Sequence, residues 1–192
     1  MRKNDPLVKT LSVLKKLMNK LGCPWMIIGG VAASLLGKPR FTADVDVVII
    51  IDLKDLPNII KTAEKLGLEP RIQDAESFAR KNRVLLLQYK KSSINVDISL
   101  GLLPFEQEAI KKSRQLKVGG LNLNFPMVED LIIFKAVANR SQDLLDIQEL
   151  VNANPKLDAK YIKKALKEFA TVLEMPEILK ETEKILSTKE KQ

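Results

Sequence analysis

The sequence contains no histidine and only one cysteine, Cys23. Without histidine, the usual catalytic triads, most zinc sites and histidine acid–base catalysis are excluded. One cysteine allows neither an internal disulfide nor a CxxC metal site, and its position beside Pro24 and an apolar run favours an inert, partly buried thiol. Any chemistry must therefore rest on carboxylates, lysines, arginines and hydroxyls, a set that suits metal-assisted phosphoryl or nucleotidyl transfer.

Long apolar runs are also missing. No run approaches the roughly 18 to 20 residues that a membrane-spanning helix needs, and residues 1–10 lack the apolar core of a signal peptide. We therefore expect a cytoplasmic protein with no membrane partner. The chain has 192 residues, of which 45% are hydrophobic and 29% charged, as in ordinary globular proteins. This length allows one well-buried domain, or a core with a small helical appendage, but not two large domains.

The charge balance is basic, with 32 lysines and arginines against 24 acidic residues and a net charge of +8. Such a surface attracts polyanions, which places RNA or DNA ahead of a small neutral substrate. The alternative is that the lysines serve only solubility.

The most informative stretch is residues 25–50, in which Asp44 and Asp46 begin a strongly apolar run. Strand side chains alternate between faces, so the two carboxylates would share one face, about 6.6 Å apart along the chain at roughly 3.3 Å per residue. They would repel each other unless a cation lay between them, and oxygen ligands favour Mg²⁺ or Mn²⁺. The simpler alternative is a pair of solvated residues where a strand begins.

Two glycines, Gly29 and Gly30, separate an apolar strand predicted at residues 25–28 from a helix predicted at residues 31–36. Glycine lets a phosphate approach the backbone closely, and the free N–H groups at the start of a helix attract the anion. An ordinary tight turn would need glycine as well. The order of the features is more specific: strand, glycine pair, helix, Arg40 and Thr42, and then the two aspartates.

This order, written GGVAAxxxGxxRxTxDVD, resembles the signature of the nucleotidyltransferase fold of the DNA polymerase beta superfamily. More narrowly, it is similar to the AbiEii-like nucleotidyltransferases of toxin–antitoxin and abortive-infection systems. The resemblance is firm over residues 25–50 and extends to about residue 150. Many members have serine as the second residue of the turn, where this chain has Gly30, so no role of that hydroxyl carries over.

The resemblance implies an α/β fold with a mixed sheet, flanking helices and a C-terminal helical part. We predict a core at residues 1–125 and a helical region at residues 126–192. The remaining expected elements are helices at 6–21, 53–66, 105–112, 127–151 with a break near 139–141, 158–170 and 176–187, and strands at 84–89, 93–100 and within 115–125. A short piece of unassigned type is expected around residues 68–72.

Asp97 is a lone acid on the polar face of the strand predicted at residues 93–100. The resemblance implies that the third metal-binding carboxylate comes from a strand after Asp44 and Asp46, and Asp97 occupies that place. The alternative is a solvated strand residue.

A second part of the resemblance is a helix with Lys135, followed by R-x-x-D-x-x-D from Arg140 to Asp146. Lys135 would neutralise charge on a triphosphate. Asp143 and Asp146 lie at i and i+3 near a helix start, where capping or an ion pair with Arg140 is the alternative to a role in the site.

The sequence therefore predicts a metal-dependent nucleotidyltransferase that uses an NTP and two Mg²⁺ or Mn²⁺ ions. Its acceptor would be RNA such as tRNA, or a protein, and the resemblance adds a possible cognate antitoxin. Alternatives are an aminoglycoside-type acceptor, a catalytically weak nucleotide-binding, RNA-binding or antitoxin-like partner protein, and a metal-dependent phosphotransferase or nuclease. The expected metal ligands are Asp44, Asp46 and Asp97; the expected nucleotide-binding residues are Gly29, Gly30, Arg40, Thr42, Lys135 and Asp143, with Lys135 and the three ligands as catalytic residues. For Arg40, the alternative is an ion pair near the DxD strand.

Overall fold

The computed structural model describes residues 5–189, and the chain divides into two compact units. The first, here called the sheet unit, comprises Met1–Val31 and Thr42–Phe125, and the second, the helical unit, comprises Ala32–Phe41 and Pro126–Gln192. The division falls inside helix α2 (Gly29–Leu36). No helix within residues 5–189 has the length and apolar character needed to cross a membrane.

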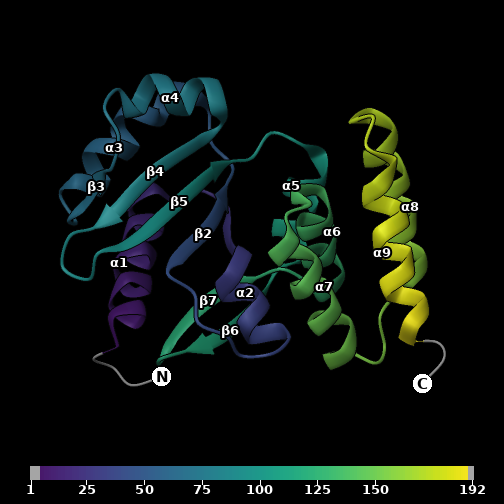
Figure 1. Ribbon diagram of the computed structural model, residues 1–192. Coiled ribbons are helices and arrows are strands. Elements are labelled where there is room, and N and C mark those ends of the chain that lie inside the picture. The colour runs from purple at the N-terminus through teal and green to yellow at the C-terminus, as the bar shows by residue number, and fades with distance from the viewer. Residues whose placement is uncertain (1–4, 190–192) are drawn as a thin grey trace. The chain divides into compact units, whose positions relative to one another are not determined.

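A five-stranded sheet forms the centre of the sheet unit, with the strand order β1-β2-β5-β4-β3 (Figure 1). β2 and β5 run parallel and the other neighbours are antiparallel, so the sheet is mixed, as predicted. β6 and β7 form a separate two-stranded hairpin. The strands are β1 (Trp25–Ile28), β2 (Asp44–Ile49), β3 (Leu68–Pro70), β4 (Val84–Tyr89), β5 (Ile94–Leu100), β6 (Arg114–Val118) and β7 (Leu121–Phe125).

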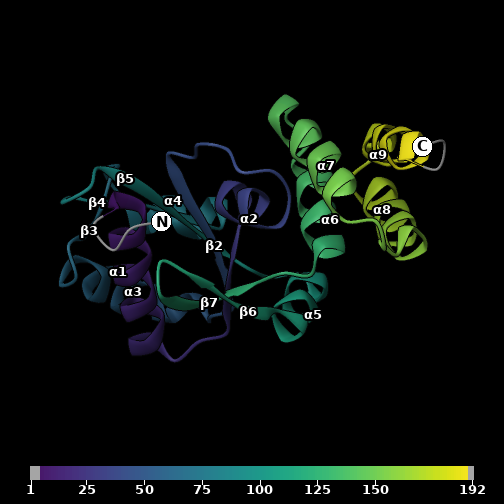
Figure 2. The ribbon, with the colours of Figure 1, turned by 90° about the horizontal axis from the view of Figure 1, so that it is seen from below.

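The two faces of the sheet differ in polarity because apolar and polar residues alternate along the central strands. On β2, Val45, Val47 and Ile49 are completely buried, and Val96 and Ile98 of β5 are buried beside them. Helices α1 and α3 pack against each other, and α1 also packs on β5 (Figure 2). The opposite face therefore receives the polar residues of the same strands.

The helices of the sheet unit have clear local causes. α1 begins at Pro6, where the Asp5 carboxylate accepts a hydrogen bond from the Leu7 N–H, and ends at Gly22 with φ +64°. The sequence pattern did not predict α4, whose segment AESFARKN carries few apolar residues. These helices are α1 (Pro6–Leu21), the 3₁₀ turn η1 (Leu53–Asp55), α3 (Leu56–Glu64), α4 (Ala75–Asn82) and α5 (Pro104–Lys112).

In the helical unit, α8 and α9 lie side by side in both views (Figures 1 and 2). Ile162 and Leu166 of α8 and Ile178 of α9 are buried, so each helix packs an apolar side within the unit. The predicted break near residues 139–141 is also present, because α6 ends at Ala138 and the next residue, Asn139, is left-handed with φ 48°. The helices are α6 (Val128–Ala138), α7 (Ser141–Ala153), α8 (Ala159–Val172) and α9 (Pro176–Lys189).

Candidate active site

Asp44, Asp46 and Asp97 share one face of the central sheet. In the parallel pairing of β2 and β5, Asp44 lies opposite Asn95, and Asp46 lies opposite Asp97. Residues directly opposite each other on neighbouring strands project to the same side, with strands about 4.8 Å apart. All three aspartates are neither fully buried nor fully exposed. The strand register therefore places the three predicted metal ligands on the same face of two neighbouring strands inside the sheet.

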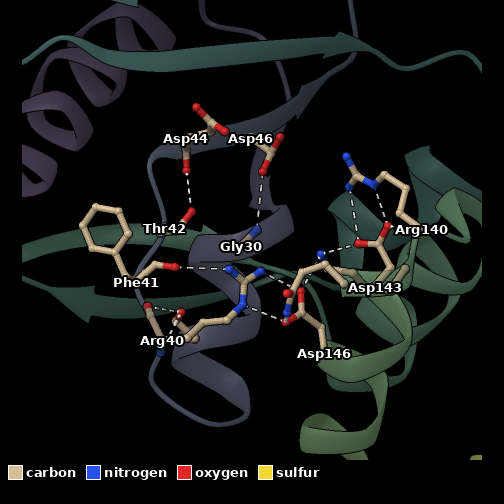
Figure 3. A network of polar contacts seen from close by, with 12 residues as sticks. Gly30, Arg40, Phe41, Thr42, Asp44, Asp46, Arg140, Asp143 and Asp146 are labelled. Carbon is tan, nitrogen blue, oxygen red and sulfur yellow. Dashed lines mark hydrogen bonds and ion pairs between the residues drawn. The ribbon is translucent and has the colours of Figure 1, made fainter.

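The start of β2 is held by hydrogen bonds from two polar side chains, one of which is itself oriented by a third. Asn95 Nδ2 donates to Asp44 Oδ1 at 2.9 Å, and Gln88 Nε2 donates to Asn95 Oδ1 at 3.1 Å. The Thr42 hydroxyl donates to the backbone carbonyl of Asp44 at 3.0 Å (Figure 3). Sequence reasoning did not identify Asn95 and Gln88 as supports, because the cross-strand register that joins them to Asp44 is a tertiary feature.

The glycine pair lies directly beside Asp46. The Gly30 N–H donates to Asp46 Oδ2 over a long 3.4 Å (Figure 3), and α2 begins at Gly29. Gly29 has φ +64°, and a Cβ added there would lie 1.9 Å from Asp46 Oδ2. A side chain at Gly29 would therefore be strained and would also displace the carboxylate. The structure thus gives the glycine at position 29 a reason of its own, the contact with Asp46, and phosphate binding by Gly29 and Gly30 stays a prediction.

Asp97 forms an ion pair with Arg71, a residue that the sequence analysis did not single out. Burial raises the pKa of Asp97 above its usual value, the Arg71 guanidinium opposes that rise, and the negative charge of Asp44 adds to it. A cation bound between Asp44 and Asp97 would offset the electrostatic repulsion between their carboxylates.

Within residues 5–189, no three acidic, cysteine or histidine side chains are gathered closely enough to hold a metal ion. The carboxylates instead have protein partners: Asn95 for Asp44, Gly30 for Asp46 and Arg71 for Asp97. The donor set nevertheless fits a hard divalent cation, since it consists of carboxylate oxygens that already share one face. Metal binding by Asp44, Asp46 and Asp97 stays a prediction.

The helical unit contains a buried cluster of charges around Lys135. The Lys135 ammonium lies 2.7 Å from Asp143 Oδ1 and 2.8 Å from Asp146 Oδ2, and its side chain is only 5% exposed. Lys135 projects from α6 and both aspartates from α7, so the cluster joins the two helices. Burying an ammonium group is tolerable here because two carboxylates surround it.

Two arginines complete the cluster. Arg40 donates through Nε and Nη2 to the two oxygens of Asp146 at 2.7 and 2.8 Å, and Arg140 donates through Nε to Asp143 Oδ2 at 2.6 Å (Figure 3). Burial would raise the pKa of Asp143, but its bonds from Arg140 and Lys135 outweigh burial and hold the pKa below the usual range. The pKa of Asp146 is likewise lowered, because Arg40 and Lys135 outweigh its burial.

The cluster bears on the roles predicted for its members. Asp143 accepts a hydrogen bond from the Arg140 N–H as well as from its guanidinium, so capping and ion pairing both occur there. Asp146 pairs with Arg40 and Lys135, whereas the ion-pair alternative had named Arg140. Contact of Lys135, Arg40 or Asp143 with a nucleotide stays a prediction. Within the cluster, the Arg140 side chain is the most exposed, at 73%.

Comparison with solved structures defines the class of the fold. The chain is similar to an antigenic nucleotidyltransferase-like protein from Paracoccidioides brasiliensis, with TM-score 0.53, 17% identity and 91% of each chain covered. It is also similar to the antibiotic-resistance factor ANT(2'')-Ia, with TM-score 0.58, 14% identity and coverage of 87% of this chain and 92% of that one. A third similar structure is the lincosamide antibiotic adenylyltransferase LnuA, with TM-score 0.52, 16% identity and coverage of 76% of this chain and 97% of that one. The fold is therefore that of a nucleotidyltransferase.

A family model described as "Nucleotidyl transferase AbiEii toxin, Type IV TA system" matches residues 13–191, and the chain belongs to this family. The match covers the C-terminal helices, where the sequence motifs had carried the resemblance only to about residue 150. A comparison with curated proteins gives no significant match.

Proposed function

We propose that the protein is a metal-dependent nucleotidyltransferase that moves a nucleoside monophosphate from an NTP to a hydroxyl of RNA or protein, as the toxin of a toxin–antitoxin pair. The observation that carries the proposal is the strand register that sets Asp46 opposite Asp97, with Asp44 on the same face. The AbiEii family supports the reaction class and the toxin role.

The proposed chemistry uses the polar face of the sheet unit. Asp44, Asp46 and Asp97 would hold two Mg²⁺ or Mn²⁺ ions, which when bound stabilise charge on the attacking and leaving oxygens. The acceptor hydroxyl oxygen forms a bond to the α-phosphorus, the bond from that phosphorus to the bridging oxygen breaks, and pyrophosphate leaves. Asp97 takes the hydroxyl proton, and the N–H groups at Gly29 and Gly30 receive the phosphates.

The choice of a macromolecular acceptor rests on charge. A net charge of +8 attracts a polyanion such as tRNA and disfavours a cationic aminoglycoside. Two structural neighbours are named for antibiotic resistance or antibiotic adenylylation, so small molecules remain the second acceptor class to assay. A cognate antitoxin would be the protein partner of the same chain.

The test is incubation of the full chain with each labelled NTP and Mg²⁺ or Mn²⁺, with separate arms for total tRNA, cell protein, lincomycin and an aminoglycoside. The Asp44→Asn/Asp46→Asn variant is the control for the site. We expect label on tRNA or protein from the parent and none from the variant.

Each other outcome assigns a different function. Label on an antibiotic alone would move the acceptor to the small-molecule class, and loss of RNA without incorporated label would indicate a nuclease. If neither parent nor variant transfers label in any arm, but NTP or RNA still binds, the protein would be a nucleotide- or RNA-binding partner protein and not an enzyme.

A further inference from the structure

Arg71 and Asp97 meet across an intervening strand. The Arg71 N–H donates to the Leu86 carbonyl at 3.2 Å, which extends the pairing of β3 and β4 by one residue beyond Pro70. Leu86 is in turn the register partner of Asp97. Arg71 and Asp97 therefore belong to one cross-strand row, two strand spacings or about 10 Å apart at the backbone. The arginine side chain spans the width of β4 to reach the carboxylate.

This ion pair joins two partly accessible groups. The Arg71 side chain is 30% exposed and the Asp97 side chain 27%. Extending an arginine across a strand restricts many rotamers and is entropically unfavourable. The contact is favoured because Asp97 is partly desolvated and lies near the negative charge of Asp44. Arg71 thus supplies, from within the chain, the positive charge that this face of the sheet requires.

We propose that Arg71 is a tethered counter-ion that competes with the divalent cation for Asp97 and, once displaced, binds a phosphate of the nucleotide. The inference rests on the proposed metal site and adds a residue and an order of events to it. If Asp97 held a cation, its carboxylate would no longer need the Arg71 guanidinium, which would then be free to turn toward a phosphate. The planar guanidinium has the donor geometry that binds phosphate oxygens.

The two halves of the proposal predict opposite effects of one substitution. Without nucleotide, Arg71→Gln should bind Mn²⁺ about fivefold more tightly than the parent, the factor for one partly exposed ion pair that no longer competes. With saturating Mn²⁺, the same variant should bind a non-hydrolysable NTP analogue about tenfold more weakly, because a charge-assisted contact is missing. Arg71→Lys, which keeps the charge, should lie between parent and Arg71→Gln in both measurements.

Electron paramagnetic resonance of free Mn²⁺ measures the metal affinity of the full chain directly, without turnover. The matched control is Arg80→Gln, which removes an equal charge from the same unit and breaks an exposed pair with Glu76. It should leave both affinities within twofold of the parent. Equal Mn²⁺ affinity in Arg71→Gln and the parent, or an equal rise in Arg80→Gln, would overturn the inference.

The site control separates this inference from the proposed function. If Asp44→Asn/Asp46→Asn abolishes Mn²⁺ binding while Arg71→Gln changes nothing, the metal site stands and only the role of Arg71 is wrong. If the parent shows no Mn²⁺ binding that depends on Asp44 and Asp46, both proposals fail together. A purely structural Arg71 would lower the unfolding temperature in Arg71→Gln without tightening Mn²⁺ binding, which also overturns the inference.

Discussion

The acids of the sheet unit and those of the helical unit differ in burial and in charge compensation. Asp44, Asp46 and Asp97 are half-buried on a polar sheet face, and burial raises the pKa of Asp97. Asp143 and Asp146 are 1% and 4% exposed, are surrounded by three cations, and have lowered pKa values. In the sheet unit, three aspartates thus share a face with one paired arginine, Arg71. In the helical unit, two buried aspartates are neutralised by one lysine and two arginines.

The largest effect on stability should come from the buried cluster. Lys135→Met removes the ammonium shared by Asp143 and Asp146 and leaves each with one arginine. Breaking a buried pair costs about 3 to 5 kcal/mol, and we expect the low end of that range because of the two arginines. Urea unfolding followed by circular dichroism measures the loss. Arg80→Ala, which breaks only the exposed pair with Glu76, should unfold like the parent. A Lys135→Met variant as stable as the parent would remove the distinction between the two clusters.

The next effect tests the close contact of Gly29 with Asp46. Gly29→Ala combines a left-handed backbone with a Cβ only 1.9 Å from Asp46 Oδ2, whereas Gly22→Ala has the same φ of +64° and no heavy atom within 4 Å of its Cβ. Backbone strain alone should cost each variant on the order of 1 kcal/mol of unfolding free energy. Gly29→Ala should lose more than that and also lose Mn²⁺ binding. Equal stability and equal metal affinity in the two variants would contradict the contact.

A smaller effect is expected from the residue that orients Asp44. Asn95→Ala removes the donor to Asp44 Oδ1 and also the acceptor for Gln88. Loss of such a supporting bond lowers metal affinity by about tenfold, without a change of ligand. Mn²⁺ titration of Asn95→Ala measures this, with Asn122→Ala on the β6–β7 hairpin as a control outside the carboxylate face. Unchanged affinity in Asn95→Ala would show that Asp44 needs no such support.

The smallest effect is the pH dependence of the stability that Asp146 contributes to the helical unit. Because the folded pKa of Asp146 is lowered, its contribution to stability is complete above the unfolded pKa, about 3.9, and is lost as the pH falls through the lower folded value. The stability advantage of the parent over Asp146→Asn should therefore be constant above about pH 5 and should shrink below pH 4. Urea unfolding at steps from pH 6 to pH 2.5 gives both curves, and parallel curves would contradict the lowered pKa.

Much of the fold was predictable because period-two and helical patterns are local. The strands at residues 25–28 and 84–89 and the helix at 6–21 lie where the pattern placed them. Helix α4 was missed because its apolar face is short, and residues 32–41 join the helical unit although they lie between two strands of the sheet unit. The polarity of Asp97's face was also predictable, whereas its pairing with Arg71 was not.

The sequence by itself indicated the reaction class to test, because Gly29-Gly30, Asp44 and Asp46 form a short motif whose order is typical of nucleotidyltransferases. Only the tertiary structure decided which acidic side chains are paired with lysine or arginine. The register of β3, β4 and β5 brings Arg71 to Asp97, and the packing of α6 against α7 buries Lys135 between two carboxylates. Such contacts join residues far apart in the chain, and their energies depend on burial and distance, which no local pattern contains.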